Sequence, residues 1–154
     1  MTAWHEYAEG VKNGKITACK RLKQAVKRYF SDLENSLYTF DPEVVERFIA
    51  FSRVCPHVKG AMRGSPIELE PWQQFAFACI LGFKVKATGR RKYTSAFIEV
   101  PRKNAKSTVA AILANWFLVM ENGQQDIYTA AVSRDQARIV FDDARQMCLL
   151  SRPL

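Results

Sequence analysis

Residues 95–108 most constrain how this chain can fold, because an apolar run, a basic loop and the start of a helical pattern follow one another directly. The apolar run ends at Val100, and the basic loop closes on Lys106-Ser107-Thr108. Apolar residues at helical spacing from Val109 to Met120 then predict a helix. Strand, short loop, lysine with serine or threonine, and helix is the layout of a phosphate-binding P-loop.

Both glycines of the common P-loop pattern, G-x-x-x-x-G-K-[ST], are replaced in this loop. Val100 and Ala105 occupy their positions. If position 105 requires a positive φ angle, alanine costs on the order of 1 kcal/mol there. The residues alone leave two interpretations open: a degenerate P-loop, or an ordinary basic loop between a strand and a helix.

The basic residues of the chain are concentrated in two segments. With 154 residues, 48% of them hydrophobic, the chain is long enough for one domain with a substantial core. Its net charge is +8; residues 1–30 hold seven basic and two acidic residues, and residues 84–106 hold eight and one. This distribution favours binding of a polyanion such as a nucleotide or nucleic acid. A basic but inert surface is the alternative, and charge alone does not separate the two.

Neither a membrane span nor a secretion signal is indicated. No apolar stretch approaches the ~18 residues that a spanning helix needs. The first ten residues lack the basic start and apolar core of a signal peptide. The four cysteines are scattered without a C-x-x-C pair, which predicts reduced, mostly buried thiols and a chain that acts in cytoplasm.

Helical periodicity and capping residues predict four further helical segments. One covers Thr17–Ser36 and carries lysines on its outer faces. Another begins at Asp41-Pro42, an N-cap followed by proline at the first helical position. A third runs from Pro71 to Gly82 and should be buried, because it is apolar almost all round. The last, Ser133–Leu150, should turn Ala144, Met147 and Phe141 inward.

The second half of the chain is predicted to be β-α-β-α. Strands are expected at 95–100 and 126–132, with the helix between them reaching about Asn122. Parallel strands joined by a right-handed crossover follow from this order. The predicted fold class is therefore α/β, with a helical N-terminal section over residues 1–60 and the start of a P-loop NTPase parallel sheet over residues 61–154.

Four segments of the chain, taken in order, carry a resemblance to one protein family. Residues 100–108 read VPRKNAKST, residues 69–73 read LEPWQ, and residues 130–137 read AAVSRDQA. The opening segment contributes the short matches Tyr7-Ala8, Gly14-Lys15-Ile16 and Ala18-Cys19-Lys20. Together they resemble the large terminase subunits of tailed phages, whose Walker A variant is close to VPRKNGKST. Val100 is ordinary in that variant, so Ala105 is the one departure.

The resemblance implies an ATP site with Mg²⁺. Lys106 would be the phosphate-binding lysine and Ser107 the Mg²⁺ ligand. Arg102 would couple the ATP state to movement, and Gln73 would read adenine through its amide. The full set implied is catalytic Lys106 and Arg102, with ATP contacts from Gln73, Arg102, Lys103, Asn104, Ala105, Lys106, Ser107 and Thr108. For Gln73, a plain helix start beside a buried Trp72 is the alternative.

The resemblance also implies a motor that packages double-stranded viral DNA into proheads in the cytoplasm of the host cell. Its partners would be the small terminase subunit and the portal, on which the full-length protein would be oligomeric. Asp142 and Asp143 look like a Walker B pair, but their helical context predicts two exposed aspartates instead. Without Walker B and nuclease residues, we expect an N-terminal fragment, expressed as such or left by a truncated prophage gene, that binds ATP without completing hydrolysis.

Two other functions remain open from the residues. The basic segment 17–36 could make the chain a non-catalytic module that binds DNA or the small terminase subunit. The loop at 100–108 could equally belong to a helicase or another P-loop translocase.

Overall fold

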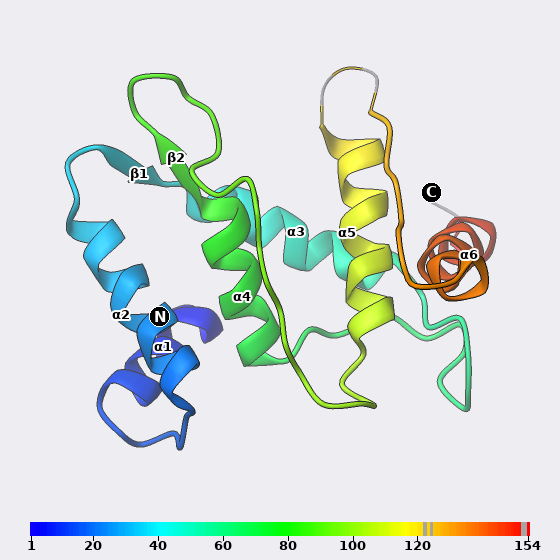
Figure 1. The fold of residues 1–154 in the computed structure, drawn as a ribbon, viewed down its shortest axis with the longest axis horizontal. Coiled ribbons are helices and arrows are strands. Elements are labelled where there is room, and N and C mark those ends of the chain that lie inside the picture. The colour runs from blue at the N-terminus through cyan, green and yellow to red at the C-terminus, as the bar shows by residue number, and fades with distance from the viewer. Residues whose placement is uncertain (122, 124, 152–153) are drawn as a thin grey trace. The chain divides into compact units, whose positions relative to one another are not determined.

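The described part of the chain is a mixed helix and strand structure (Figure 1). A computed structural model describes residues 1–121, 123, 125–151 and 154. Among these residues the elements are α1 (Ala3–Lys12), α2 (Lys20–Glu34), β1 (Tyr38–Phe40), α3 (Pro42–Val54), α4 (Pro71–Gly82), β2 (Phe83–Val85), α5 (Lys106–Met120) and α6 (Arg134–Leu150). None of these helices is long and apolar enough to cross a membrane.

The chain divides into two compact units, each built from two stretches of sequence. Unit 1 comprises Met1–Ile49 and Leu69–Phe97, and unit 2 comprises Ala50–Glu68 and Ile98–Leu154. Helix α3 contributes its first part to unit 1 and its last part to unit 2. The functional division at residue 60 stays a prediction.

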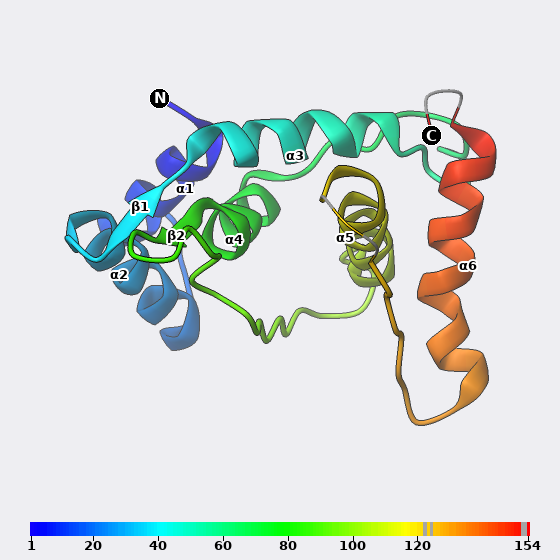
Figure 2. The same ribbon diagram turned by 90° about the horizontal axis from the view of Figure 1, so that it is seen from above.

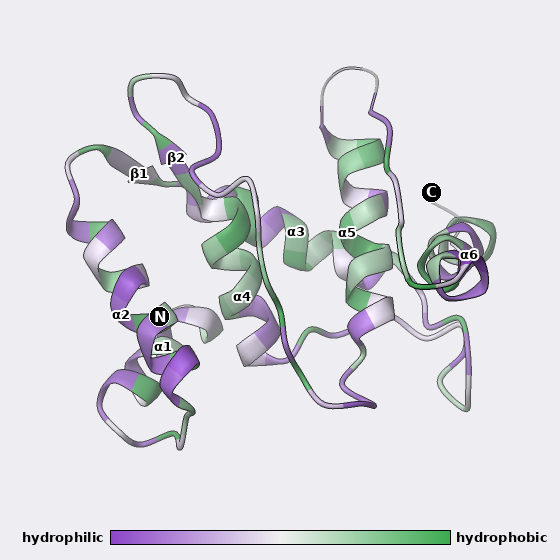
Figure 3. Cartoon of the chain, in the orientation of Figure 1, coloured by the Kyte–Doolittle hydropathy of each residue, from purple (hydrophilic) through white to green (hydrophobic). Residues whose placement is uncertain are grey.

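Unit 1 is built around buried aromatic rings. The ring of Tyr29 on α2 lies with its centroid 5.5 Å from that of Phe75 and 5.8 Å from that of Phe83. Burial raises the pKa of Tyr29 to about 12. The fully enclosed members of this core are Trp4, Ala8, Val11, Val26, Tyr29, Val45, Phe75, Ala78 and Phe83. Helix α4 supplies the apolar centre, as its composition predicted, whereas α2 is hydrophilic over much of its surface (Figure 3).

Local capping signals mark the starts of α3 and α6. Asp41 Oδ1 accepts the backbone N–H of Val44 at 3.3 Å, and Ser133 Oγ accepts that of Gln136 at 3.3 Å. The predicted N-caps Asp41 and Ser133 are therefore confirmed, whereas the N-cap predicted at Thr17 is wrong. Helix α2 starts later than predicted, at Lys20 with Cys19 as its N-cap and no side-chain cap bond. Helix α5 ends at Met120, and the predicted end at Asn122 lies outside the described residues.

The strands differ from the prediction. Strands β1 and β2 pair antiparallel, with Tyr38 opposite Val85 and Phe40 opposite Phe83. Each has three residues, too few for a clear period-2 pattern, and the partners are far apart in sequence. Gly82 lies against this pair, and a Cβ atom there would come within 2.4 Å of Cε2 of the Phe40 ring, so the ring would have to move.

The predicted strands at 95–100 and 126–132 are absent from the described structure, and no parallel pair is present there. Their apolar side chains are open to solvent: Phe97 is 90% exposed, Tyr128 87% and Val132 100%. A strand exists only when a second strand accepts and donates its backbone hydrogen bonds. The apolar pattern predicted strands but carried no information about which strand would pair with them. The described residues therefore show no parallel sheet, although one was predicted.

Unit 2 packs α5 against α6, which cross at a steep angle (Figures 1 and 2). Ile112 and Met147 are fully buried between them, and Trp116 is 3% exposed. The amide nitrogen of Asn115 donates to the carbonyl of Ala144 at 3.1 Å. Phe141 is 57% exposed, so its predicted inward orientation is wrong, while Ala144 and Met147 are buried as predicted.

Residues 142 and 143 lie within α6, as predicted, but only one of them is solvated. Asp142 lies 3.4 Å from Arg138 on the same helix face. Asp143 is 4% exposed and lies 2.5 Å from Lys59 Nζ, an ion pair that neutralises it although its Oδ1 accepts no aligned hydrogen bond. The prediction of two exposed aspartates is wrong for Asp143, because periodicity could not foresee that a loop lysine covers it.

All four cysteines are free thiols, but they are less buried than predicted. Cys55 is buried and Cys19 is exposed, with Cys79 and Cys148 between these limits. Burial raises the pKa of both Cys55 and Cys79 to about 12. The thiolate forms of these two residues are therefore scarce at neutral pH.

Asp41 gives a pH-dependent prediction for stability. Lys84 Nζ lies 2.7 Å from its Oδ2, and this bond, followed by the N–H of Val44, holds the pKa of Asp41 below its usual value. A carboxyl with a lowered folded pKa stabilises the fold above its unfolded pKa, about 3.9, and that contribution disappears as pH falls through the folded pKa. We expect Asp41→Ala to cost about 1 kcal/mol at pH 7, and less at pH 3. Urea unfolding at the two pH values measures this, and an equal cost at both would contradict it.

Candidate functional site

The loop over residues 100–108 holds its shape through its own side chains. The amide nitrogen of Asn104 donates to the carbonyls of Pro101 and Arg102, at 3.2 and 3.1 Å. Lys106 Nζ donates to the carbonyls of Val100 and Pro101, both at 2.9 Å. The lysine therefore turns back over the loop that precedes it, and the loop closes on itself before α5 begins.

Two residues of this loop have left-handed backbone conformations. Lys103 has φ of 68° and Ala105 φ of 54°, and they are the non-glycine residues with positive φ in the described part of the chain. For a residue with a Cβ atom this conformation costs about 1–2 kcal/mol. Position 105 thus takes the conformation for which a glycine is favoured, as the sequence comparison with P-loops suggested. Strain of this kind is typical of ligand-binding loops.

Helix α5 begins directly after the strained residues and has no side-chain cap. Ala105 is its N-cap, and its side chain offers no hydrogen-bonding group. The first N–H groups of a helix have no partner within it, and they carry the positive end of the helix dipole. A pocket of about 290 Å³ opens here, lined by Arg102, Lys103, Ala105, Lys106, Ser107 and Thr108.

The charges around this pocket are uncompensated. Arg102, Lys103 and Lys106 are exposed, and among the described residues no carboxylate lies within 4.0 Å of their cationic groups. Three cations, open helix N–H groups and two hydroxyls form a donor set for an oxyanion. Ser107 and Thr108 are half-buried and belong to the first turn of α5, where Ser107 is the candidate for a metal ligand.

Gln73 lies in unit 1, whereas the 100–108 loop lies in unit 2. Its side chain is 6% exposed, and its Oε1 accepts the backbone N–H of Glu70 at 2.9 Å. The two residues form a capping box at the start of α4. This supports the plain helix-start interpretation, although Trp72 is only half-buried. An adenine contact by Gln73 would have to use mainly its amide nitrogen.

One stretch of sequence that includes both Gln73 and the 100–108 loop matches a known protein family. A family model described as terminase large subunit, ATPase domain, matches residues 71–154. The chain belongs to this family. The terminase match begins at the first residue of α4 and leaves α1, α2 and α3 outside it. Neither the curated proteins nor the solved structures yield a match.

Asn104 also has a structural role in this loop, which the sequence analysis did not predict. Its amide nitrogen donates to two carbonyls of the loop itself. Asparagine side chains commonly form hydrogen bonds with backbone groups close to them in sequence. This tendency could have predicted the structural role of Asn104. Asn104 therefore bridges the first part of the loop to its own position, and its contact with ATP stays a prediction.

Proposed function

We propose that the 100–108 loop is a Walker A P-loop that binds ATP with Mg²⁺. The observation that carries this is the pair of left-handed residues, Lys103 and Ala105, at the uncapped start of α5 beside three uncompensated cations. Successive N–H groups in such a turn make a concave site for anions. Lys106 would leave its loop carbonyls for the β- and γ-phosphates, and the Ser107 hydroxyl would hold Mg²⁺.

Arg102 and Gln73 have further roles in the same proposal. Arg102 lines the pocket with an exposed guanidinium group and would respond to the charge of the terminal phosphate. Gln73 would contact adenine through its amide nitrogen, since Oε1 already accepts a hydrogen bond. Bound Mg²⁺ would neutralise phosphate charge and orient the terminal phosphoryl group.

Membership of the terminase family supports a role in packaging double-stranded viral DNA. The partners we propose are that DNA, the small terminase subunit and the portal of the prohead, with oligomeric assembly on the portal in the host cytoplasm. The parallel β-α-β-α arrangement belongs to this proposal. Residues 98–100 and 126–132 flank α5 in sequence and form no secondary structure. Ile98, Ile127 and Val132 are exposed there, so their backbone is available for strand pairing.

A second function has support from α2. Lys20, Lys23 and Lys27 are exposed along this helix, which lies outside the region matched by the family. Such a surface suits a module that binds DNA or the small terminase subunit. DNA binding through it would weaken steeply with salt and survive changes in the 100–108 loop.

The test of nucleotide binding compares the natural chain with Ala105→Gly in calorimetric titrations with Mg-ATP. The strain at Ala105 is present without nucleotide, so relieving it acts mainly on the stability of the fold. Glycine also gives the unfolded chain more entropy, which opposes this gain, and the net change in the free energy of unfolding should be less than about 1 kcal/mol. The affinity should rise roughly threefold to tenfold, because removal of the methyl group lets phosphate approach the N–H groups more closely. Thermal unfolding without nucleotide separates the two effects. Absence of a heat signal in both proteins would refute the proposal.

A further inference from the structure

The pocket at the start of α5 offers hydrogen-bond donors for phosphate, but no side chain in its lining favours adenine. That lining supplies three cations and the hydroxyl groups of Ser107 and Thr108. Adenine presents a donor, its 6-amino group, beside the acceptor N7, whereas guanine presents two acceptors, N7 and O6. Cationic side chains only donate, and a hydroxyl group donates or accepts, so neither kind selects adenine against guanine. Selection of adenine would therefore need an amide.

Asn104, the amide side chain of this loop, has its donor half engaged. Its nitrogen donates to the carbonyls of Pro101 and Arg102, at 3.2 and 3.1 Å. An amide distinguishes adenine by donating to N7 and accepting from the 6-amino group at the same time. Because the nitrogen is held by the loop itself, Asn104 cannot make this paired contact while the loop keeps its conformation.

Gln73 has the other half of its amide engaged. Its Oε1 accepts the backbone N–H of Glu70 at 2.9 Å, within the capping box at the start of α4, and the residue is only 6% exposed. The amide nitrogen, which donates, fits N7 of either purine and O6 of guanine, but it cannot accept the 6-amino group of adenine. A contact from this nitrogen would therefore help both purines to bind.

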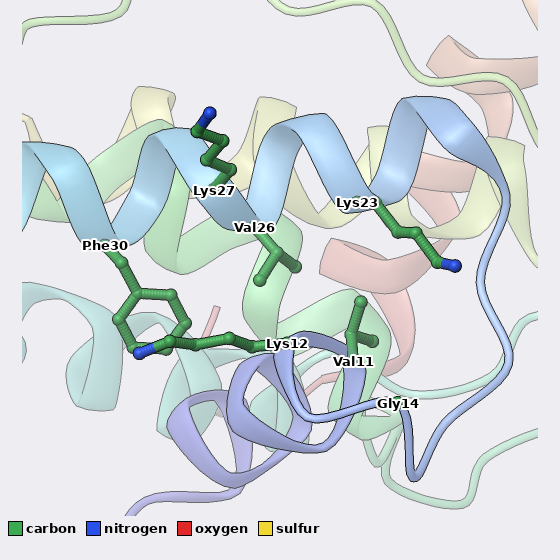
Figure 4. Close-up of a pocket in the computed structure, with 7 residues that line it drawn as sticks. All are labelled: Val11, Lys12, Gly14, Lys23, Val26, Lys27 and Phe30. Atoms are coloured by element: carbon green, nitrogen blue, oxygen red, sulfur yellow. The ribbon is translucent and has the colours of Figure 1, made fainter.

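A second pocket, in unit 1 between the end of α1 and α2, does not supply the missing acceptor (Figure 4). Its charged side chains, Lys12, Lys23 and Lys27, are hydrogen-bond donors only. Phe30 is the aromatic residue of its lining, and the ammonium group of Lys12 lies 4.0 Å from the centre of that ring. Stacking on an aromatic ring tolerates every base, so this pocket would not select adenine either.

We infer that the nucleotide site of this chain accepts guanosine triphosphate at least as readily as adenosine triphosphate. Its substrate class is then purine nucleoside triphosphates, chosen by their phosphates rather than by the base. The two ligands carry the same triphosphate, so the cations, the helix N–H groups and Mg²⁺ treat them alike. A paired amide contact to one base gives roughly tenfold discrimination or more, and both amides named above are already half engaged. The inference rests on the proposed function, since it concerns the ligand of the 100–108 loop.

The test titrates the full chain with Mg-ATP, Mg-GTP and Mg-ITP in a calorimeter. ITP is the matched ligand, because its base carries an oxygen where adenine carries the 6-amino group and lacks the 2-amino group of guanine. GTP and ITP should each bind within about threefold of ATP, or more tightly. An ATP affinity more than threefold above that of either ligand overturns the inference and leaves the P-loop proposal standing. Absence of binding by all three refutes the P-loop proposal, and the inference with it.

Gln73→Met tests base selection at one residue, because methionine keeps the volume of glutamine and lacks the amide. It should lower the melting temperature, since the N–H of Glu70 loses its acceptor, and change the ATP and GTP affinities by the same factor. Gln74→Met is the matched control: Gln74 is the next residue of α4, and its amide nitrogen donates to the carbonyl of Leu69 at 2.7 Å. A ratio of ATP to GTP affinity that falls more than twofold in Gln73→Met but not in Gln74→Met overturns the inference. Circular dichroism verifies that both variants fold, and the ligand series on the natural chain decides if they do not.

Discussion

Lys106→Ala is expected to weaken Mg-ATP binding by roughly 10- to 100-fold, measured by calorimetric titration. A hydrogen bond to a charged group contributes about 1.5–3 kcal/mol, and Lys106 would form such bonds with the phosphates. In the free loop its ammonium group donates to the carbonyls of Val100 and Pro101. When ATP binds, Lys106 exchanges these neutral carbonyl acceptors for charged phosphate oxygens. Its contribution to the affinity is therefore the difference in free energy between the two sets of hydrogen bonds.

Lys86→Ala is the control for this change, because it removes the same charge from an exposed residue outside the 100–108 loop. It should leave the affinity within about twofold, since an exposed distant charge acts weakly through solvent. Lys106→Arg tests geometry separately: arginine keeps the charge but replaces a compact ammonium with a planar group. Equal affinities of Lys106→Ala and the natural chain would contradict the assignment of Lys106 to phosphate.

Asp32→Asn is expected to lower the free energy of unfolding by about 3 kcal/mol, measured by urea unfolding at pH 7. Asp32 is 7% exposed and pairs through one oxygen with Lys92, while the other accepts the hydroxyl of Tyr93. Burial, and after it the bond to Asp32, raises the pKa of Tyr93. The ammonium of Lys92 also lies 3.8 Å from the centre of the Tyr38 ring. Replacing the carboxylate by a neutral amide would leave a largely buried ammonium group without the charge that neutralises it.

The double variant Asp32→Asn/Lys92→Met separates the ion pair from the packing around it. It should be more stable than Asp32→Asn alone, because the uncompensated charge is gone. Asp142→Asn provides the control, since Asp142 is paired with Arg138 at 3.4 Å on the exposed face of α6. That change should cost about 0.5 kcal/mol or less. Similar costs for Asp32→Asn and Asp142→Asn would show that burial adds nothing to the first pair.

The helices of this chain were largely predictable because their signals are local. Asp41 and Ser133 bond to N–H groups three residues ahead, and the apolar run of α4 requires no knowledge of its neighbours to be recognised as buried. The start of α2 was placed too early because Thr17 is a good cap by type, whereas the backbone turns only at Cys19.

The strands and ion pairs were not predictable in this way because each depends on a distant partner. Nothing near Tyr38 in sequence indicates that it will lie opposite Val85, and nothing near Asp143 indicates Lys59. The same limit explains the error at 95–100 and 126–132, where apolar residues are present but no strand pairs with them in the described structure.

The candidate site could be located from residue order alone, because its lining lies within nine consecutive positions: VPRKNAKST joins cations, a tight turn and a helix start. The partners of these groups in the free chain, in contrast, depend on the folded backbone. It puts Ala105 at positive φ and directs Lys106 to its own loop. It also engages Gln73 in a helix cap. Backbone angles and side-chain partners depend on packing and hydrogen bonds between segments. The order of residues in the sequence does not specify these contacts.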